Sequence, residues 1–237
     1  MSVQEEIREE QKKLKGKGLK YKLSYFWDYY RIHTIVVVCV IVFGSFIARD
    51  MLENSKPSYL DAVFANTTLM AGNEDSTIVS DYIEYAGIDM NEYNLYLDFS
   101  TVLSDDFDKM TELTMASQQK MMAMFAAEQI DIFCAPKGVI ENFSVSEVFG
   151  DITALLPSDL MAEIEAKGYE IFYYDTEDGR TIPGGIYVDG CEYLKSQGSL
   201  GLYPVSDEDR LRPVLTITAN AKNMDHVIEF LLMITSY

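Results

Sequence analysis

The chain has 237 residues, and its 38 acidic and 19 basic side chains give it a formal net charge of −19. The charge is uneven, because residues 50–237 hold 33 acidic and 10 basic side chains, a net charge of −23, whereas the first 49 residues are net basic. A segment this acidic repels nucleic acid and anionic lipid headgroups at long range, so we expect no nucleic-acid partner.

Residues 1–24 are expected to form a charged cytoplasmic arm. Within residues 2–16 the acidic side chains come first and the basic ones follow. This order suits the dipole of a helix, and it predicts a short helix that ends near Gly16 and Gly18. We interpret the arm as a topogenic charge cluster, with partner binding as the alternative.

An apolar run begins at Ile32 and ends at Ala48, and apart from His33 it has no residue that is charged near neutral pH. As a helix it spans about 25 Å, slightly less than the hydrocarbon core of about 30 Å. The aromatic residues of 25–30 and the flanking arginines extend it into the headgroup region. Residues 25–49 are therefore predicted to be an aromatic belt and a single membrane-spanning helix.

The run is predicted to be an uncleaved anchor of the cell membrane. Phe46 lies three places before a cut after Ala48, where a signal peptidase needs a small residue. Eight basic residues precede the run, and only Arg49 and Lys56 follow it closely. By the distribution of basic residues the N-terminus is cytoplasmic and the C-terminal part is extracellular. A buried core element of a soluble domain is the alternative.

After a linker at 50–58, residues 59–237 alternate between strand-like and helix-like segments. Strands are predicted at 59–65, 94–100, 131–135, 169–175, 184–190 and 214–220. Helices are predicted at 75–87, 110–129, about 138–149, 157–168 and 223–236. This alternation predicts one extracellular α/β domain, a sandwich lobe with a mostly parallel or mixed sheet.

Two helices carry more detailed predictions. The helix at 75–87 has Asp75 or Ser76 as its expected cap and Gly87 as its stop. The helix at 110–129 is the strongest helix signal, and four of its apolar residues recur at helical spacing: Leu113, Met121, Met124 and Phe125. Such a methionine-rich helix can bind partners, but we interpret these four residues as an ordinary core face.

The sequence offers no catalytic or cofactor motif, so we predict neither an enzyme nor a cofactor. A serine–histidine or cysteine–histidine relay would depend wholly on His226, and an exported hydrolase that uses His226 or a carboxylate pair is the alternative. The acidic turns at 105–108, 175–179 and 207–210 lack the spacing of an EF-hand loop, so no metal site is predicted. Cys134 and Cys191 form a possible disulfide in an oxidising exterior.

Three segments of the domain resemble type 2 extracellular (periplasmic-type) solute-binding proteins. They are "QQKMMAMFAAEQIDIFCAP", "FGDITALLPSD" and "LTITANAKNMDHVIEFLLMI", about a third of the domain. The chain departs from the family in having residues 128–130 where the family usually has glycine and proline before the aspartate. It is also much shorter than a two-lobed binding protein, so the resemblance implies a single, reduced lobe. The topology is similar to that of uncharacterised single-pass proteins of Gram-positive bacteria.

The resemblance implies a membrane-anchored binding or sensing module for a small-molecule or peptide ligand. Open α/β sheets bind ligands at the carboxyl ends of their strands. The loops expected there supply the candidate ligand-binding residues Asn66, Thr67, Thr68, Ser100, Thr101, Pro136, Lys137, Gly184 and Gly185. The alternative is an interaction or scaffolding subunit of a cell-envelope or transporter assembly with a membrane-protein partner. An exposed apolar patch would favour that alternative.

Overall fold

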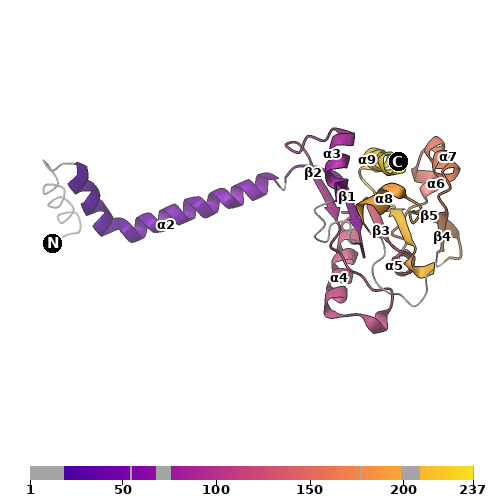
Figure 1. The fold of residues 1–237 in the computed structure, drawn as a ribbon. Helices are drawn as coiled ribbons and strands as arrows, with labels where there is room; N and C mark the ends of the chain where they lie inside the picture. The colour runs from indigo at the N-terminus through magenta and orange to yellow at the C-terminus, as the bar shows by residue number, and fades with distance from the viewer. Residues whose placement is uncertain (1–18, 54, 68–75, 177, 199–208, 237) are drawn as a thin grey trace. The chain divides into compact units, whose positions relative to one another are not determined.

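The structure, a computed structural model, describes residues 19–53, 55–67, 76–176, 178–198 and 209–236 (Figure 1). The chain divides into two compact units, Met1–Ser55 and Lys56–Tyr237. The helix predicted at 2–16 lies outside the described residues.

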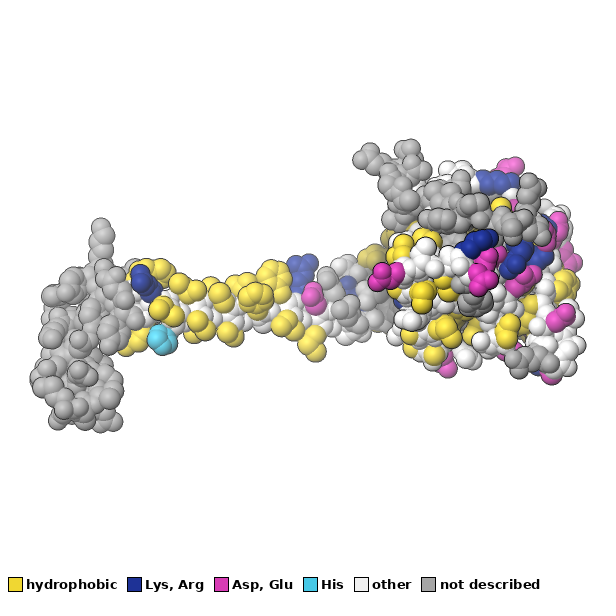
Figure 2. Space-filling model, turned by 90° about the horizontal axis from the view of Figure 1, so that it is seen from below, with side chains coloured by type: hydrophobic (Ala, Val, Ile, Leu, Met, Phe, Trp, Pro, Cys, Tyr) yellow, Lys and Arg dark blue, Asp and Glu magenta, His cyan; other side chains and the backbone are white. Residues whose placement is uncertain are grey.

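The first unit contains one long helix, α2 (Leu19–Glu53). Within it, Tyr30–Met51 is long and apolar enough to cross a membrane, and none of this stretch is buried in the protein. Figure 2 shows hydrophobic side chains along the helix with basic side chains toward its two ends. The helix therefore fits a single-pass membrane anchor, and the alternative of a buried core element does not hold. It continues to Glu53, past the residue at which the spanning segment was expected to end.

The second unit is built on a six-stranded mixed sheet. Its strands are β1 (Ser58–Phe64), β2 (Asn94–Asp98), β3 (Ile132–Pro136), β4 (Ile171–Asp175), β5 (Thr181–Tyr187) and β6 (Pro213–Ile217). They lie in the order β2-β1-β3-β6-β5-β4. The pairs of β1 with β2 and with β3 are parallel, and the other three pairs are antiparallel. The predicted α/β class is confirmed, and of the two expected kinds of sheet, mostly parallel or mixed, this open sheet is mixed.

Helices cover both faces of this sheet. Since neighbouring side chains of a strand point to opposite faces, one strand can supply residues to the core on each side. On β1, Leu60, Ala62 and Phe64 enter one core cluster, and Val63 enters the other. The first cluster also contains side chains of α3 (Ile78–Ala86), α6 (Ile152–Leu155), α7 (Ser158–Ala166), α8 (Glu192–Gln197) and α9 (Met224–Thr235). The second contains side chains of α4 (Glu112–Ala126) and α5 (Lys137–Ser144). Two short 3-10 turns, η1 (Phe107–Lys109) and η2 (Asp209–Leu211), complete the described elements.

The start of α3 differs from the prediction. The helix begins at Ile78 with Thr77 before it, not after Asp75, which lies outside the described residues, or Ser76. Gln197 lies at this start, where its side-chain oxygen accepts a 2.6 Å hydrogen bond from the backbone N–H of Thr77. A contact across 120 residues of sequence therefore holds the residue that precedes the helix. Its predicted end is confirmed, since Gly87 adopts the left-handed conformation with φ 65°.

One residue of α4 departs from the predicted core face. Met121 is fully buried, and Met124 and Phe125 are partly buried, as expected, but Leu113 is 65% exposed. Thr114 is buried instead, because its hydroxyl and backbone N–H form a capping box with Thr111. Thr114, Met121 and Phe125 lie on one stripe at helical spacing, and Leu113 lies beside this stripe in the first turn of the helix.

Asp131, just before β3, ties the start of α9 to the sheet. The carboxylate is 3% exposed. It accepts hydrogen bonds from the backbone N–H groups of Lys222 (2.8 Å), Asn223 (3.2 Å) and Asp61 (3.1 Å), and from Nδ2 of Asn223 (2.8 Å). One buried carboxylate thus joins β1, β3 and the N-terminal end of α9, where a negative charge also meets the helix dipole favourably.

Candidate functional site

The loops after β1 and β2 meet, as the parallel pairing of these strands requires. The backbone N–H of Asn66 donates to the carbonyl oxygen of Thr101 at 3.0 Å. The side chain of Asn66 donates to the carbonyl of Leu103 (2.9 Å) and accepts from its N–H (2.8 Å). Asn66, Thr67 and Thr101 are all buried, and Thr68 lies outside the described residues. The polar groups of Asn66 are therefore used within the protein.

Asp98, the last residue of β2, organises the second loop. Its carboxylate accepts from Ser100 N–H (2.8 Å) and Oγ (2.7 Å), from Thr101 Oγ1 (2.8 Å), from Tyr96 Oη (3.1 Å) and from Lys120 Nζ (2.8 Å). Burial raises the pKa of Asp98, but the hydrogen bonds from Lys120, Ser100 and Thr101 outweigh burial and hold it well below its usual range. Ser100 and Thr101 thus donate hydrogen bonds to a carboxylate of the protein itself.

Pro136 and Lys137 lie where β3 ends and α5 begins. The ammonium group of Lys137 makes a short ion pair with Asp209 and lies 3.9 Å from Glu141. The hydrogen bond to Asp209 raises the pKa of Lys137. This candidate cation is therefore neutralised by two neighbouring carboxylates.

Gly184 and Gly185 do not lie in a loop, because β5 begins at Thr181 and both glycines are buried inside it. A Cβ on Gly184 would lie 2.4 Å from the ring of Tyr174, and a Cβ on Gly185 would lie 2.5 Å from the carbonyl oxygen of Leu215. Close packing of the sheet thus accounts for both glycines. The strand starts earlier than predicted because the segment before Gly184 pairs with β4 as a hairpin, through Pro183 and Ile182.

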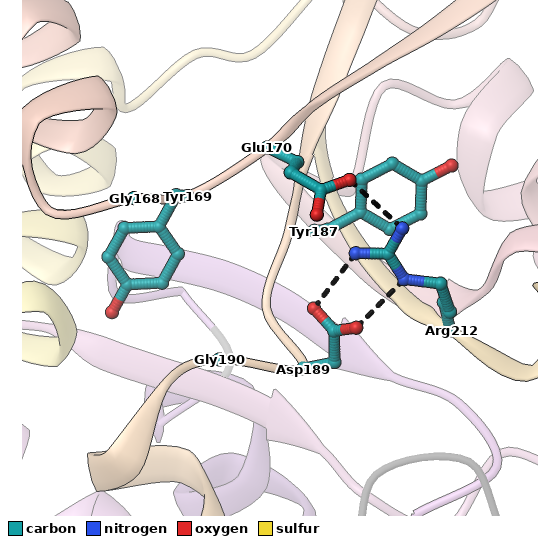
Figure 3. A pocket seen from close by; sticks show the side chains of 7 residues that line it. All are labelled: Gly168, Tyr169, Glu170, Tyr187, Asp189, Gly190 and Arg212. Atoms are coloured by element: carbon teal, nitrogen blue, oxygen red, sulfur yellow. Dashed lines mark hydrogen bonds and ion pairs between the residues drawn. The ribbon is translucent and has the colours of Figure 1, made fainter.

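A cleft that no sequence pattern indicated lies at another part of the sheet (Figure 3). Its volume is about 230 Å³, and three distant parts of the chain form it. They contribute the lining residues Gly168, Tyr169, Glu170, Tyr187, Asp189, Gly190 and Arg212.

Arg212 is the central side chain of this cleft. Its Nε lies 2.8 Å from Asp189 Oδ2, its Nη2 lies 3.3 Å from Oδ1, and its Nη1 lies 3.0 Å from Glu170 Oε2. The guanidinium carbon stands 3.9 Å from the centre of the Tyr187 ring, a cation–π contact. The hydrogen bonds to Asp189 and Glu170 raise the pKa of Arg212. Figure 3 shows Tyr169 on the opposite side of the cleft.

A second, smaller hollow of about 130 Å³ lies where α4 and α5 end. Its lining includes Phe125, Glu128 and Glu147. Both glutamates have positive φ, 53° and 50°, and each follows the end of a helix, where the chain commonly turns into the left-handed region. Nζ of Lys222 lies 3.4 Å from Oε2 of Glu128, and Nη2 of Arg180 lies 3.8 Å from Oε1 of Glu147. The turns that follow α4 and α5 therefore account for the positive φ of these two glutamates.

The outward side of α4 is mostly apolar, with the exposed Gln119 among its apolar residues. We define the α4 apolar face as Met115, Ala116, Met122, Ala123 and Ala126, which are all exposed and recur at helical spacing. Met115 is 50% exposed and Met122 is 57% exposed. The opposite side of the helix packs Met121 and Phe125 into the core. Both sides of α4 are therefore rich in methionine and apolar residues, and only one of them is covered within the described protein.

His226 stacks on Tyr59, with 3.6 Å between the ring centres. Its Nδ1 lies 3.4 Å from Glu229 Oε2, which also accepts a 2.8 Å hydrogen bond from the Tyr59 hydroxyl. Burial and this bond to Glu229 raise the pKa of Tyr59 to about 12. Among the described residues, no serine or cysteine is hydrogen-bonded to the His226 ring, so this arrangement gives no support to the histidine-dependent hydrolase.

Cys134 and Cys191 are both buried free thiols, so the possible disulfide is not formed. Cys134 lies on β3 and Cys191 precedes α8, where its thiol donates to the carbonyl of Ile234 at 3.3 Å. Within the part of the chain that the structure describes, no three histidine, cysteine or acidic side chains are grouped closely enough to hold a metal ion.

The chain matches no protein-family model, no curated protein and no solved structure. The resemblance to solute-binding proteins therefore stays a prediction, and a function has to be inferred from the geometry of the chain itself.

Proposed function

We propose that this protein is a membrane-anchored interaction subunit of a cell-envelope assembly, and that its globular unit docks on a partner protein through the α4 apolar face. In this proposal α2 spans the cell membrane, the lysine-rich N-terminal arm is cytoplasmic, and residues 56–237 are extracellular. The length and composition of α2 support the anchor, and the excess of basic residues before its apolar part supports the orientation.

The α4 apolar face carries the proposal. Exposed apolar side chains gain free energy when a partner removes them from water, about 25 cal/mol for each Å². Methionine suits such a surface because its unbranched side chain adapts to different partners. The helix itself is held firmly, since Met121 and Phe125 are anchored in the core and Lys120 binds Asp98 of β2.

The charge of the globular unit indicates what kind of partner fits. Residues 56–237 hold 31 acidic and 10 basic side chains, a net charge of −21, so two copies of this unit repel each other. A partner with an apolar surface surrounded by lysine or arginine is complementary both to the α4 apolar face and to the negative charge of the unit. We therefore propose a different protein with a basic rim, and not a second copy of this chain.

Solute binding at the carboxyl ends of the strands has less support. Asn66, Ser100 and Thr101 direct their polar groups to other parts of the protein, and Lys137 is paired with Asp209. A ligand at these loops would have to replace contacts that already exist.

Site-specific photo-cross-linking in native membranes tests the proposal. A benzophenone amino acid at position 122 is compared with one at position 145, because Met122 and Val145 are equally exposed, at 57%, but Val145 follows α5. We expect an adduct of one defined mass from position 122 only, and its loss when Met115→Glu is added. Equal adducts from both positions, or an adduct with the mass of two copies of this chain, would contradict the proposal.

A further inference from the structure

We propose that the cleft around Arg212 binds a small organic cation, a ligand with a primary amine or a guanidinium group. This site is separate from the α4 apolar face and from the loops after β1 and β2. The cleft volume of about 230 Å³ lies below the usual range of ligand pockets, about 300–1,000 Å³, so the cleft suits a ligand of only a few heavy atoms.

The local charge favours a cation. Two carboxylates, Glu170 and Asp189, face one guanidinium in the cleft, which leaves one negative charge in excess. Figure 3 shows both carboxylates against the same guanidinium, on the side of the cleft opposite Tyr169. The net charge of −23 on residues 50–237 also raises the local concentration of small cations.

Glu170 and Asp189 have different tasks. Asp189 engages Arg212 through both of its oxygens, at 2.8 and 3.3 Å, and this bidentate pair holds the guanidinium on the Tyr187 ring. Glu170 uses only Oε2 for its contact to Arg212, and its side chain is 67% exposed. An ion pair this exposed contributes little to stability. Glu170 can therefore turn its carboxylate toward a bound ammonium group without disturbing the remaining pair.

An anionic ligand fits the same site poorly. To reach Arg212 it would have to displace Asp189 from a bidentate, stacked arrangement, with Glu170 close by. The repulsion between like charges opposes this exchange.

Two glycines keep the cleft accessible. Gly168 and Gly190 belong to its lining, and a Cβ built on either residue meets no atom within 4 Å. Backbone carbonyl groups can accept hydrogen bonds from an ammonium ion, and the absence of side chains at both positions leaves room for a ligand to approach.

Isothermal titration of the full chain in detergent tests the inference, with putrescine as the cation and succinate as an anion of the same carbon length, at equal ionic strength. We expect saturable binding of putrescine and none of succinate. Glu170→Gln should weaken putrescine binding roughly tenfold, because one charged contact is lost.

Glu128→Gln is the matched control, since Glu128 is also an exposed carboxylate paired with a basic side chain, Lys222, but lies in the other hollow. We expect this variant to bind putrescine like the unaltered chain. Absence of saturable putrescine binding at millimolar concentration overturns the inference. Equal weakening of putrescine binding in both variants also overturns it, because it would indicate nonspecific attraction. Tighter binding of succinate than of putrescine overturns it as well. The cross-linking at Met122 is independent of all these results.

Discussion

Lys120 of α4 binds Asp98 at the end of β2, with Nζ 2.8 Å from Oδ2. The carboxylate is almost fully buried, whereas about half of the lysine side chain is exposed. The same carboxylate orders the loop that follows β2 through Ser100 and Thr101. This one pair therefore fixes both the position of α4 and the conformation of a loop in which ligand binding was predicted.

Removing the charge of Asp98 should destabilise the globular unit. In Asp98→Asn the amide nitrogen cannot accept hydrogen bonds, and Lys120 loses its partner. We expect the free energy of unfolding to fall by about 2 kcal/mol. Asp106→Asn is the control, because Asp106 makes a comparable pair with Lys109 on the exposed surface. Chemical denaturation of both variants measures the difference, and equal losses would contradict this role of Asp98.

Asp98 also predicts how stability depends on pH. The hydrogen bonds from Lys120, Ser100 and Thr101 hold its pKa below the unfolded value of about 3.9. A carboxyl group with a depressed pKa in the folded state contributes stability that is fully present above the unfolded pKa and is lost as the pH falls toward the folded pKa. Between pH 5 and 2, as order-of-magnitude limits of this window, the unaltered chain should lose more stability than Asp98→Asn. Parallel pH profiles of the two proteins would refute the prediction.

The two glycines of β5 should be intolerant of any side chain. Gly185→Ala places a Cβ 2.5 Å from a backbone carbonyl, and Gly184→Ala places one 2.4 Å from the buried Tyr174 ring. Overpacking of this kind costs about 1–3 kcal/mol. Gly190→Ala should have little effect, since its Cβ would meet nothing within 4 Å. Thermal unfolding of the three variants tests whether the two glycines are needed for packing. If they served only to bind a ligand, Gly184→Ala and Gly185→Ala would leave the stability unchanged.

The buried cysteines should be unreactive in the folded protein. Burial raises the pKa of both Cys134 and Cys191, and the thiolate is the reactive form. We expect neither thiol to react with a water-soluble thiol reagent near pH 8 until the chain unfolds, and we expect a reducing agent to leave the unfolding temperature unchanged. A drop in that temperature on reduction would show that the two residues are bridged.

Asp131 should matter more for stability than any exposed acidic residue. Asp131→Ala leaves three backbone N–H groups and one side-chain amide without their acceptor, and each unsatisfied buried donor costs about 1–3 kcal/mol. We expect a loss of at least about 3 kcal/mol. Hydrogen exchange should show the N-terminal turn of α9 opening first, and uniform protection along α9 would contradict the proposed tie.

Local sequence patterns determined the elements of this protein. Three features depend only on neighbouring residues in the chain: the apolar run after Arg31, the alternation in β2 and Gly87 at the end of α3. The helix, the strand and the helix end that they mark can therefore be predicted without a tertiary structure. The α/β class follows from the order of such elements, which leaves a mostly parallel and a mixed sheet both open. The short helices α6 and α8 were missed because four and six residues give too little periodicity to recognise.

Only the tertiary structure decided which surfaces those elements present. At the start of α4 the capping box of Thr111 and Thr114 buries Thr114 and leaves Leu113 exposed. Pairing between strands distant in sequence places Gly184 and Gly185 inside the sheet. The cleft exists because residues 168–170, 187–190 and Arg212 meet across the antiparallel strands. Such contacts depend on strand order and register, which arise from the packing of the whole unit, and no local pattern specifies them.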